Sequence, residues 1–151
     1  MSTPLRVVGV GNAARGDDAA GLLVARRLRD LAPDADVHEQ TGEPLALLEC
    51  LSGADAAVVV DALAPAGSPG RILRVDTLAD LAPACRSSTH GGGVREALEL
   101  CRALGRLPAV VTVYGIEAGD VTLGAGVSRE VVDAAERLAR DLARMLARPA
   151  A

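Results

Sequence analysis

Two aspartates and one histidine stand where the chain passes from one predicted element to the next. Asp18 follows a glycine-rich turn after the apolar run 7–10, and Asp61 closes the apolar run 56–60. His90 lies in a polar loop immediately before three glycines. If the strands are parallel, their carboxyl ends share one edge of a sheet, and the three side chains would converge on one cleft. Two carboxylates and an imidazole suit a hard or borderline metal ion such as nickel or zinc.

Each of these residues also has an interpretation that involves no function. Asp17 and Asp18 could simply stabilise the dipole of the helix that follows, by roughly 0.3–1 kcal/mol each. Asp61 could form a local side-chain turn, although a carboxylate at the end of so apolar a strand is costly unless it is paired or solvated. A lone loop histidine such as His90 is more often an exposed side chain than a ligand. The metal site is therefore a hypothesis at this point.

Composition narrows the classes of function. The 151 residues predict one domain, residues 1–151, and half of them are apolar, which allows a sizeable core. A net charge of -4 gives no attraction for nucleic acid. The sequence has no signal peptide and no apolar stretch long enough to span a bilayer, so we expect a cytoplasmic protein without a membrane partner. Because every apolar helix face is needed for the core, we expect a monomer.

The three cysteines lie far apart and never form a Cys-x-x-Cys pair. Cys50, Cys85 and Cys101 therefore argue against a disulfide framework and against a thiolate zinc site. Cys101 falls on the apolar face of a predicted helix, where packing as a buried thiol is its expected role.

The apolar pattern alternates between strand-like runs and helical periodicity. The predicted strands are residues 5–10, 36–39, 56–60, 71–75 and 109–114, and the predicted helices are residues 17–31, 44–51, 94–104 and from 128 onward. Leu104 is placed on the buried stripe of the third helix. Strand 56–60 is continuously apolar, which indicates burial on both faces; the mixed strand 71–75 fits an edge. We therefore predict an α/β fold: a three-layer α/β/α sandwich with a mostly parallel twisted sheet of about five strands, one of them an edge or antiparallel strand, and helices on both faces.

Other site chemistries fit less well. Gly9 and Gly11 after the first strand suggest a dinucleotide loop, with Ala14 at the third glycine position. However, Asp17 and Asp18 at the helix N-terminus would repel a pyrophosphate, and the chain has no lysine for a phosphate-binding P-loop. Neither a Gly-x-Ser-x-Gly elbow nor a His-Glu-x-x-His helix is present. A carboxylate pair could act on a sugar, but the chain has almost no aromatic residue to stack a sugar ring.

Five segments, in order, resemble the motifs of the hydrogenase maturation endopeptidases, which finish the large subunit of nickel–iron hydrogenases. The resemblance extends over nearly the whole chain. The segments are 8–12 with 15–18 and Gly21, 41–44 with Leu47 and Leu48, 60–62 with Gly67, Pro69 and Gly70, 88–90 before the helix at Val94, and 114–117 with Gly124 and Ser128.

The resemblance implies an endopeptidase that removes a C-terminal extension from the nickel-loaded precursor of the large subunit. Carried over by motif, Asp18, Asp61 and His90 are the metal-contacting and catalytic residues. The nickel would be presented by the precursor, which is the implied partner, and no organic cofactor is implied. The position of Asp18 is often Glu in relatives, and the second loop of relatives often carries an Asp where this chain has Gln40 or Thr41.

Two further functions stay open on the sequence. One is a non-catalytic nickel-binding or scaffold protein in hydrogenase assembly. The other is a carboxylate-based hydrolase that acts on small molecules. The response of a precursor to the purified chain, with and without nickel, would separate the three.

Overall fold

The computed structural model describes residues 5–76 and 93–148. Apolar runs form the strands and amphipathic stretches form the helices, as their periodicity predicts. The elements, in chain order, are β1 (Leu5–Val10), the 3-10 turn η1 (Gly16–Ala19), α1 (Ala20–Leu31), β2 (Asp36–Gln40), α2 (Pro44–Leu51), β3 (Ala56–Leu63), β4 (Ile72–Val75), α4 (Gly93–Ala103), β5 (Val110–Glu117) and α5 (Arg129–Ala147). No helix in these ranges has the length and apolar content needed to cross a membrane.

The five strands form one sheet in the order β2-β1-β3-β5-β4. All neighbouring pairs are parallel except β4 and β5, which are antiparallel, so β4 is the antiparallel edge strand. The chain leaves β1 toward β2 on one side and then returns past β1 to β3 on the other. Strand order therefore reverses between β1 and β3, and in open α/β sheets ligands bind outside the carboxyl ends of the strands at such a point.

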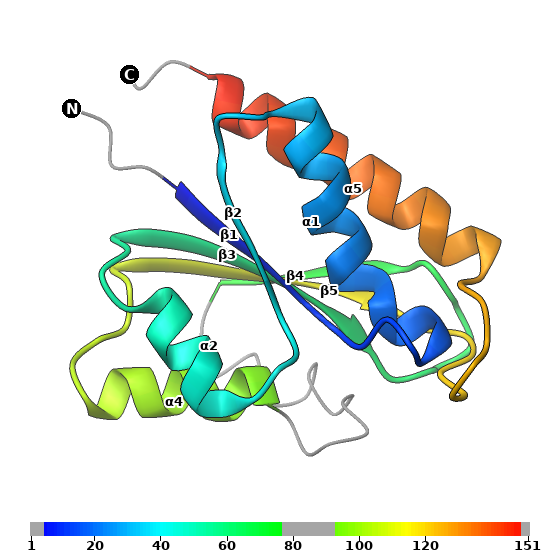
Figure 1. The fold of residues 1–151 in the computed structure, drawn as a ribbon, viewed down its shortest axis with the longest axis horizontal. Coiled ribbons are helices and arrows are strands. Elements are labelled where there is room, and N and C mark those ends of the chain that lie inside the picture. The colour runs from blue at the N-terminus through cyan, green and yellow to red at the C-terminus, as the bar shows by residue number, and fades with distance from the viewer. Residues whose placement is uncertain (1–4, 77–92, 149–151) are drawn as a thin grey trace.

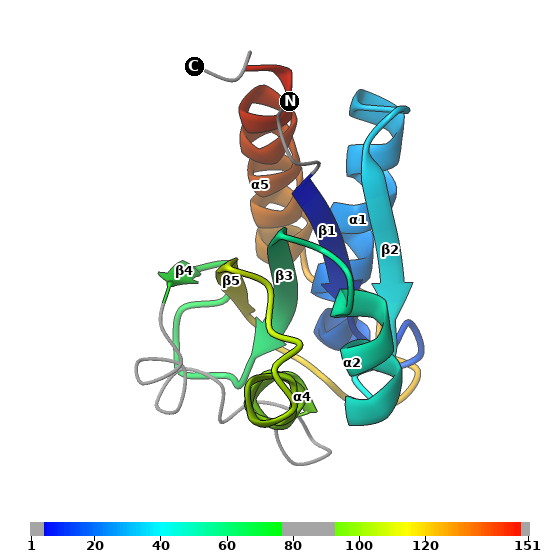
Figure 2. The same ribbon diagram turned by 90° about the vertical axis from the view of Figure 1, so that its left-hand side faces the viewer.

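Helices cover both faces of the sheet, which explains why β1 and β3 are apolar at successive positions. Neighbouring valines point to opposite faces: Val7 and Val58 pack with α1 and α5, whereas Val8 and Val59 pack with α2 and α4. Figure 1 shows α1 and α5 together on one side of the sheet and α2 and α4 on the other, and Figure 2 shows the same separation after a quarter turn. The predicted sandwich is confirmed.

Three predicted details are wrong. The helix expected over 17–31 begins as the 3-10 turn η1 and becomes α-helical only at Ala20. Asp61 does not follow its strand but lies inside β3, paired with Gly115 of β5. Leu104 lies beyond the end of α4 and is 55% exposed. The helical spacing of apolar residues in the sequence extends past Ala103, but α4 ends at Ala103. Leu104 is therefore not part of the buried stripe.

Candidate active site at the carboxyl edge of the sheet

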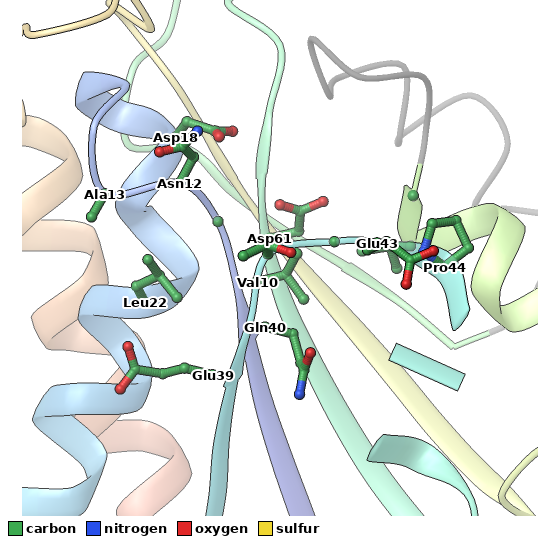
Figure 3. Close-up of a pocket in the computed structure, with 15 residues that line it drawn as sticks. Val10, Asn12, Ala13, Asp18, Leu22, Glu39, Gln40, Glu43, Pro44 and Asp61 are labelled. Carbon is green, nitrogen blue, oxygen red and sulfur yellow. The ribbon is translucent and has the colours of Figure 1, made fainter. Parts of the chain in front are cut away.

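A cleft of about 760 Å³ lies at the carboxyl ends of β1 and β3, where the strand order reverses. In Figure 3, Asp61 lies between Asn12 and Asp18 on one side and Glu43 and Pro44 on the other. The structure thus brings two of the three predicted site residues to one cavity. Its lining residues are Val10, Gly11, Asn12, Ala13, Asp18, Leu22, Glu39, Gln40, Thr41, Gly42, Glu43, Pro44, Asp61, Gly93 and Val94.

Close packing of helix against strand sets the position of Asp18. A Cβ atom on Gly11 would lie 2.2 Å from the carbonyl oxygen of Asp18, and one on Gly21 would lie 2.3 Å from backbone oxygens of β1 and β3. These approaches require glycine, and they let η1 and α1 begin directly against the strand ends. The amide of Asn12 donates to the carbonyl of Asp18 at 3.3 Å, and the amide of Asp18 donates to the carbonyl of Arg15 at 3.0 Å. The glycines of this loop therefore have a packing role that brings Asp18 to the cleft.

Asp61 is a buried carboxyl group, 7% exposed, that lies inside β3, two residues before the end of this strand. Its Oδ1 accepts a hydrogen bond from the amide of Ala62 at 2.8 Å. Burial raises the pKa of Asp61 to about 7; the hydrogen bond from Ala62 opposes this rise and the negative charge of Asp18 adds to it. A carboxyl group that titrates near neutrality in a cleft is typical of functional sites.

His90, the third predicted residue, lies outside the described residues. It stands three positions before Gly93, which lines the cleft together with Val94. Among residues 5–76 and 93–148, no group of three histidine, cysteine, aspartate or glutamate side chains is placed to hold a metal ion. The described part of the chain thus brings two of the predicted carboxylates to the cleft, and carboxylate is a donor type that hard and borderline divalent cations accept.

Two other acidic residues of the cleft stabilise its walls. Glu39 accepts hydrogen bonds from the guanidinium groups of Arg26, at 3.0 Å, and Arg29. Burial alone would raise the pKa of Glu39, but these two cations outweigh it and lower the pKa. Glu43 caps α2, because its carboxylate accepts from two backbone amides in the first turn at 2.9 and 3.2 Å. Both side chains are held by partners in the wall.

Asp17 has a role that the sequence analysis missed. It is fully buried, and its Oδ2 accepts from the amides of Gly119 at 2.7 Å and Asp120 at 3.2 Å and from the hydroxyl of Ser128 at 2.8 Å. Its Oδ1 accepts from the amide of Ser128 at 2.6 Å. Burial alone would raise the pKa of Asp17, but these hydrogen bonds outweigh it and lower the pKa. The donors lie more than a hundred positions away, so no local signal identifies Asp17.

Glu117 is a second buried carboxylate that the sequence analysis gave no structural role. It is 1% exposed at the end of β5 and accepts hydrogen bonds from the amide of Ala66 at 3.2 Å, the amide of Ser68, and the guanidinium of Arg71 at 3.2 Å. Glu117 therefore anchors the loop between β3 and β4. The resemblance included Glu117 in a motif, which is the one signal that could have singled it out.

Comparisons with known proteins point to one family. A family model described as hydrogenase maturation protease, HycI, matches residues 31–145. The chain is 28% identical to the NiFe hydrogenase maturation protease HycI from Thermococcus kodakarensis KOD1; the match covers 97% of this chain and 94% of that one, with a TM-score of 0.72. No curated protein sequence matches the chain.

Two further solved structures share the fold. The chain is 25% identical to the hydrogenase 2 maturation peptidase of Thaumarchaeota archaeon SCGC_AB-539-E09, over 95% of this chain and 97% of that one, with a TM-score of 0.67. It is 19% identical to the hydrogenase maturating endopeptidase HybD from E. coli, over 95% of this chain and 94% of that one, with a TM-score of 0.74. The last likeness shows the fold alone.

Proposed function

The chain belongs to the hydrogenase maturation protease family, and from this premise we propose that it removes a C-terminal extension from the nickel-loaded precursor of a NiFe hydrogenase large subunit. In this proposal the nickel ion arrives on the precursor and is part of the substrate. The cytoplasmic location and monomeric state expected from the sequence belong to the same proposal.

The observation that supports this proposal is the pair of carboxylates at one cleft. Asp18, in η1 after β1, and Asp61, near the carboxyl end of β3, line the same cavity. Burial is the main cause of the raised pKa of Asp61, and the charge of Asp18 adds to it. Two carboxylates that share one cleft repel each other, and a divalent cation bound by both relieves that repulsion. A nickel ion carried by the precursor would therefore bind in this cleft through the two carboxylates.

We assign the third contact to His90. A neutral imidazole is a suitable nickel ligand, and three protein ligands leave positions for groups of the precursor. The position of His90 in the sequence, three residues before the cleft residue Gly93, supports this assignment. Gln40 and Thr41, which stand where relatives often carry Asp, line the cleft as well and are candidates for contacts that select the precursor.

Hydrolysis adds one water across the scissile peptide bond and yields a new carboxylate and a new amine. Among the described residues that line the cleft, none is a serine or a cysteine. The proposed role of the carboxylates is therefore to hold the precursor by its nickel so that the scissile bond is placed in the cleft. The cation polarises the peptide carbonyl or the attacking water when it is bound there.

The test mixes the purified chain with nickel-loaded and nickel-free precursor and follows the mass of the precursor. We expect loss of a C-terminal peptide from the nickel-loaded form only. Asp18→Asn, Asp61→Asn and His90→Ala should each abolish this loss. His38→Ala is the matched control, because His38 is the other histidine of the chain and pairs with Asp36 at 2.6 Å on the edge strand β2.

The other outcomes separate the remaining functions. Binding of the nickel-loaded precursor without cleavage would select the scaffold. Indifference to both forms of the precursor would favour a small-molecule hydrolase. If the His90→Ala variant processes the nickel-loaded precursor normally, the assignment of His90 to the site is wrong.

A further inference from the structure

Asp17 and Asp18 are neighbours in sequence and have opposite environments. Asp18 lines the cleft, whereas Asp17 is fully buried on the other side of η1. Of these two aspartates, the proposed function uses only Asp18. The buried carboxylate of Asp17 thus needs an explanation of its own.

Asp17 attaches η1 to the segment between β5 and α5. Its two oxygens together accept four hydrogen bonds, at 2.6–3.2 Å, from Gly119, Asp120 and Ser128. Its own amide donates to the carbonyl of Asp120 at 2.8 Å. Gly16 has a φ of 53°, and a Cβ atom there would lie 2.4 Å from the same carbonyl. The turn is therefore docked on this segment through both backbone and side chain.

This docking determines where the main chain of Asp18 lies. A four-residue turn is too short to hold its own shape without outside contacts. On its other side, the carbonyl oxygen of Asp18 abuts Gly11 at the end of β1. The backbone of Asp18 is thus held between β1 and the bonds that Asp17 makes, and its position relative to Asp61 depends on both.

We propose that Asp17 is a positioning residue, which sets the distance between the carboxylates of Asp18 and Asp61 and so the affinity of the cleft for a divalent cation. This inference rests on the proposed function, since it takes Asp18 and Asp61 as the cation ligands. Asp17 itself does not touch the cation. Its four hydrogen bonds act through the backbone of the next residue.

The test is a double-mutant cycle on the full chain, with nickel(II) chloride as the probe. Asp17→Asn keeps the size of the side chain but leaves only one acceptor oxygen. The new amide NH2 group would face the N–H and O–H donors that bind Asp17 in the wild type. Nickel affinity is read from paramagnetic broadening of backbone amide NMR signals at the cleft, which detects binding as weak as millimolar. The variants are Asp17→Asn, Asp18→Asn and the double substitution.

Glu117→Gln is the matched control. Glu117 is also a buried carboxylate that holds a loop at the same edge of the sheet, but its donors lie in 66–71 and not in η1. Both acid-to-amide changes should lower the free energy of unfolding, which urea denaturation measures. Only Asp17→Asn should weaken nickel binding, by about tenfold or more, as the loss of groups that orient a ligand typically does.

The cycle distinguishes positioning from a merely structural role. We expect Asp17→Asn to have no further effect on nickel affinity in the Asp18→Asn background, while its effect on stability is the same in both backgrounds. Equal weakening in both backgrounds, unchanged affinity in Asp17→Asn, or equal weakening by Glu117→Gln would each overturn the inference. If Asp17→Asn does not fold, Ser128→Ala removes one of the four bonds and should weaken nickel binding less, in the same direction; wild-type affinity there would overturn it.

The cycle also separates this inference from the proposed function. If Asp18→Asn binds nickel as the wild type does, or if the wild type shows no broadening at the cleft, the assignment of the cation ligands is wrong, and the role given to Asp17 is wrong with it. If Asp18→Asn loses affinity and Asp17→Asn does not, only the inference about Asp17 is wrong.

Discussion

Replacing Asp61 by asparagine should make the protein more stable at alkaline pH and leave its stability at pH 4 unchanged. Asparagine has nearly the same size and can still accept the hydrogen bond from Ala62 through its carbonyl oxygen. It cannot ionise. The substitution therefore isolates the free-energy cost of holding a buried negative charge beside Asp18.

The sign follows from the direction in which folding moves the pKa of Asp61. Its pKa is raised from 3.8 to about 7, mainly by burial, so the folded state binds the proton more tightly than the unfolded state. The resulting stability is fully present below pH 4, falls as the pH rises from 4 to 7, and is lost above 7. Since each tenfold change in the proton equilibrium corresponds to about 1.4 kcal/mol, the loss is on the order of 4 kcal/mol.

Urea denaturation followed by far-UV circular dichroism measures this difference, because the chain has no tryptophan for fluorescence. Wild type and Asp61→Asn are compared at pH 4, 5, 6, 7 and 8 in the presence of a chelator. Asp17, Asp36 and Glu39 have lowered pKa values and give stability an opposite pH dependence. They are unchanged between the two proteins, so the difference between the curves reports Asp61 together with its interaction with Asp18.

The difference curve should be close to zero at pH 4 and rise to a few kcal/mol in favour of Asp61→Asn at pH 8. A flat curve, or a variant less stable than wild type at pH 8, would refute the reasoning that burial and Asp18 hold the proton on Asp61. The same variant should lose nickel-dependent processing. Functional sites commonly contain residues that lower the stability of the fold and are nevertheless needed for activity, and Asp61 would be such a residue.

Processing of the nickel-loaded precursor at subsaturating concentration should fall at least about tenfold for each pH unit below about 7, because Asp61 must lose its proton to contact a cation and the assigned ligand His90 must be neutral. Rates at pH 8, 7 and 6 measure this fall, and a constant rate would exclude Asp61 as a ligand. Gly21→Ala should lower the free energy of unfolding by about 2–4 kcal/mol, since its Cβ would lie 2.3 Å from backbone oxygens of β1 and β3, whereas Gly126→Ala, with nothing within 4 Å, should change it by less than about 0.5 kcal/mol. Leu28→Ala should lower the free energy of unfolding by about 2–5 kcal/mol, because Leu28 of α1 is fully buried in the core cluster that includes α5. Leu104→Ala should change it little, because Leu104 is exposed. Thermal and urea denaturation compare the two variants, and equal losses would contradict the burial of Leu28.

Much of the architecture follows from patterns that are local in the chain. Continuous apolarity in 56–60 indicates a strand covered on both faces, and the mixed pattern of 71–75 indicates an edge, and both predictions are confirmed. The placement of Asp18 and Asp61 at one cleft follows from alternating strands and helices, because parallel strands end at the same edge. These conclusions need only the spacing of side chains along a short stretch.

Other properties depend on residues that are distant in sequence. Asp17 and Asp18 carry the same functional group in adjacent positions, yet one is buried and the other lines the cleft. The reason is that the segment 119–128 supplies four hydrogen-bond donors to Asp17. The pKa of Asp61 depends on how deeply β3 is covered and on where η1 places Asp18.

The sequence alone therefore determined the order of strands and helices, the layered fold and the carboxylates that reach its carboxyl edge, since short-range periodicity encodes which face of each element is apolar. Only the tertiary structure decided which aspartate holds the frame and which faces the cleft. It also decided that a buried carboxyl group keeps its proton near neutral pH. Hydrogen bonds and desolvation act between groups that meet only after the chain has folded, and no pattern within a single segment records them.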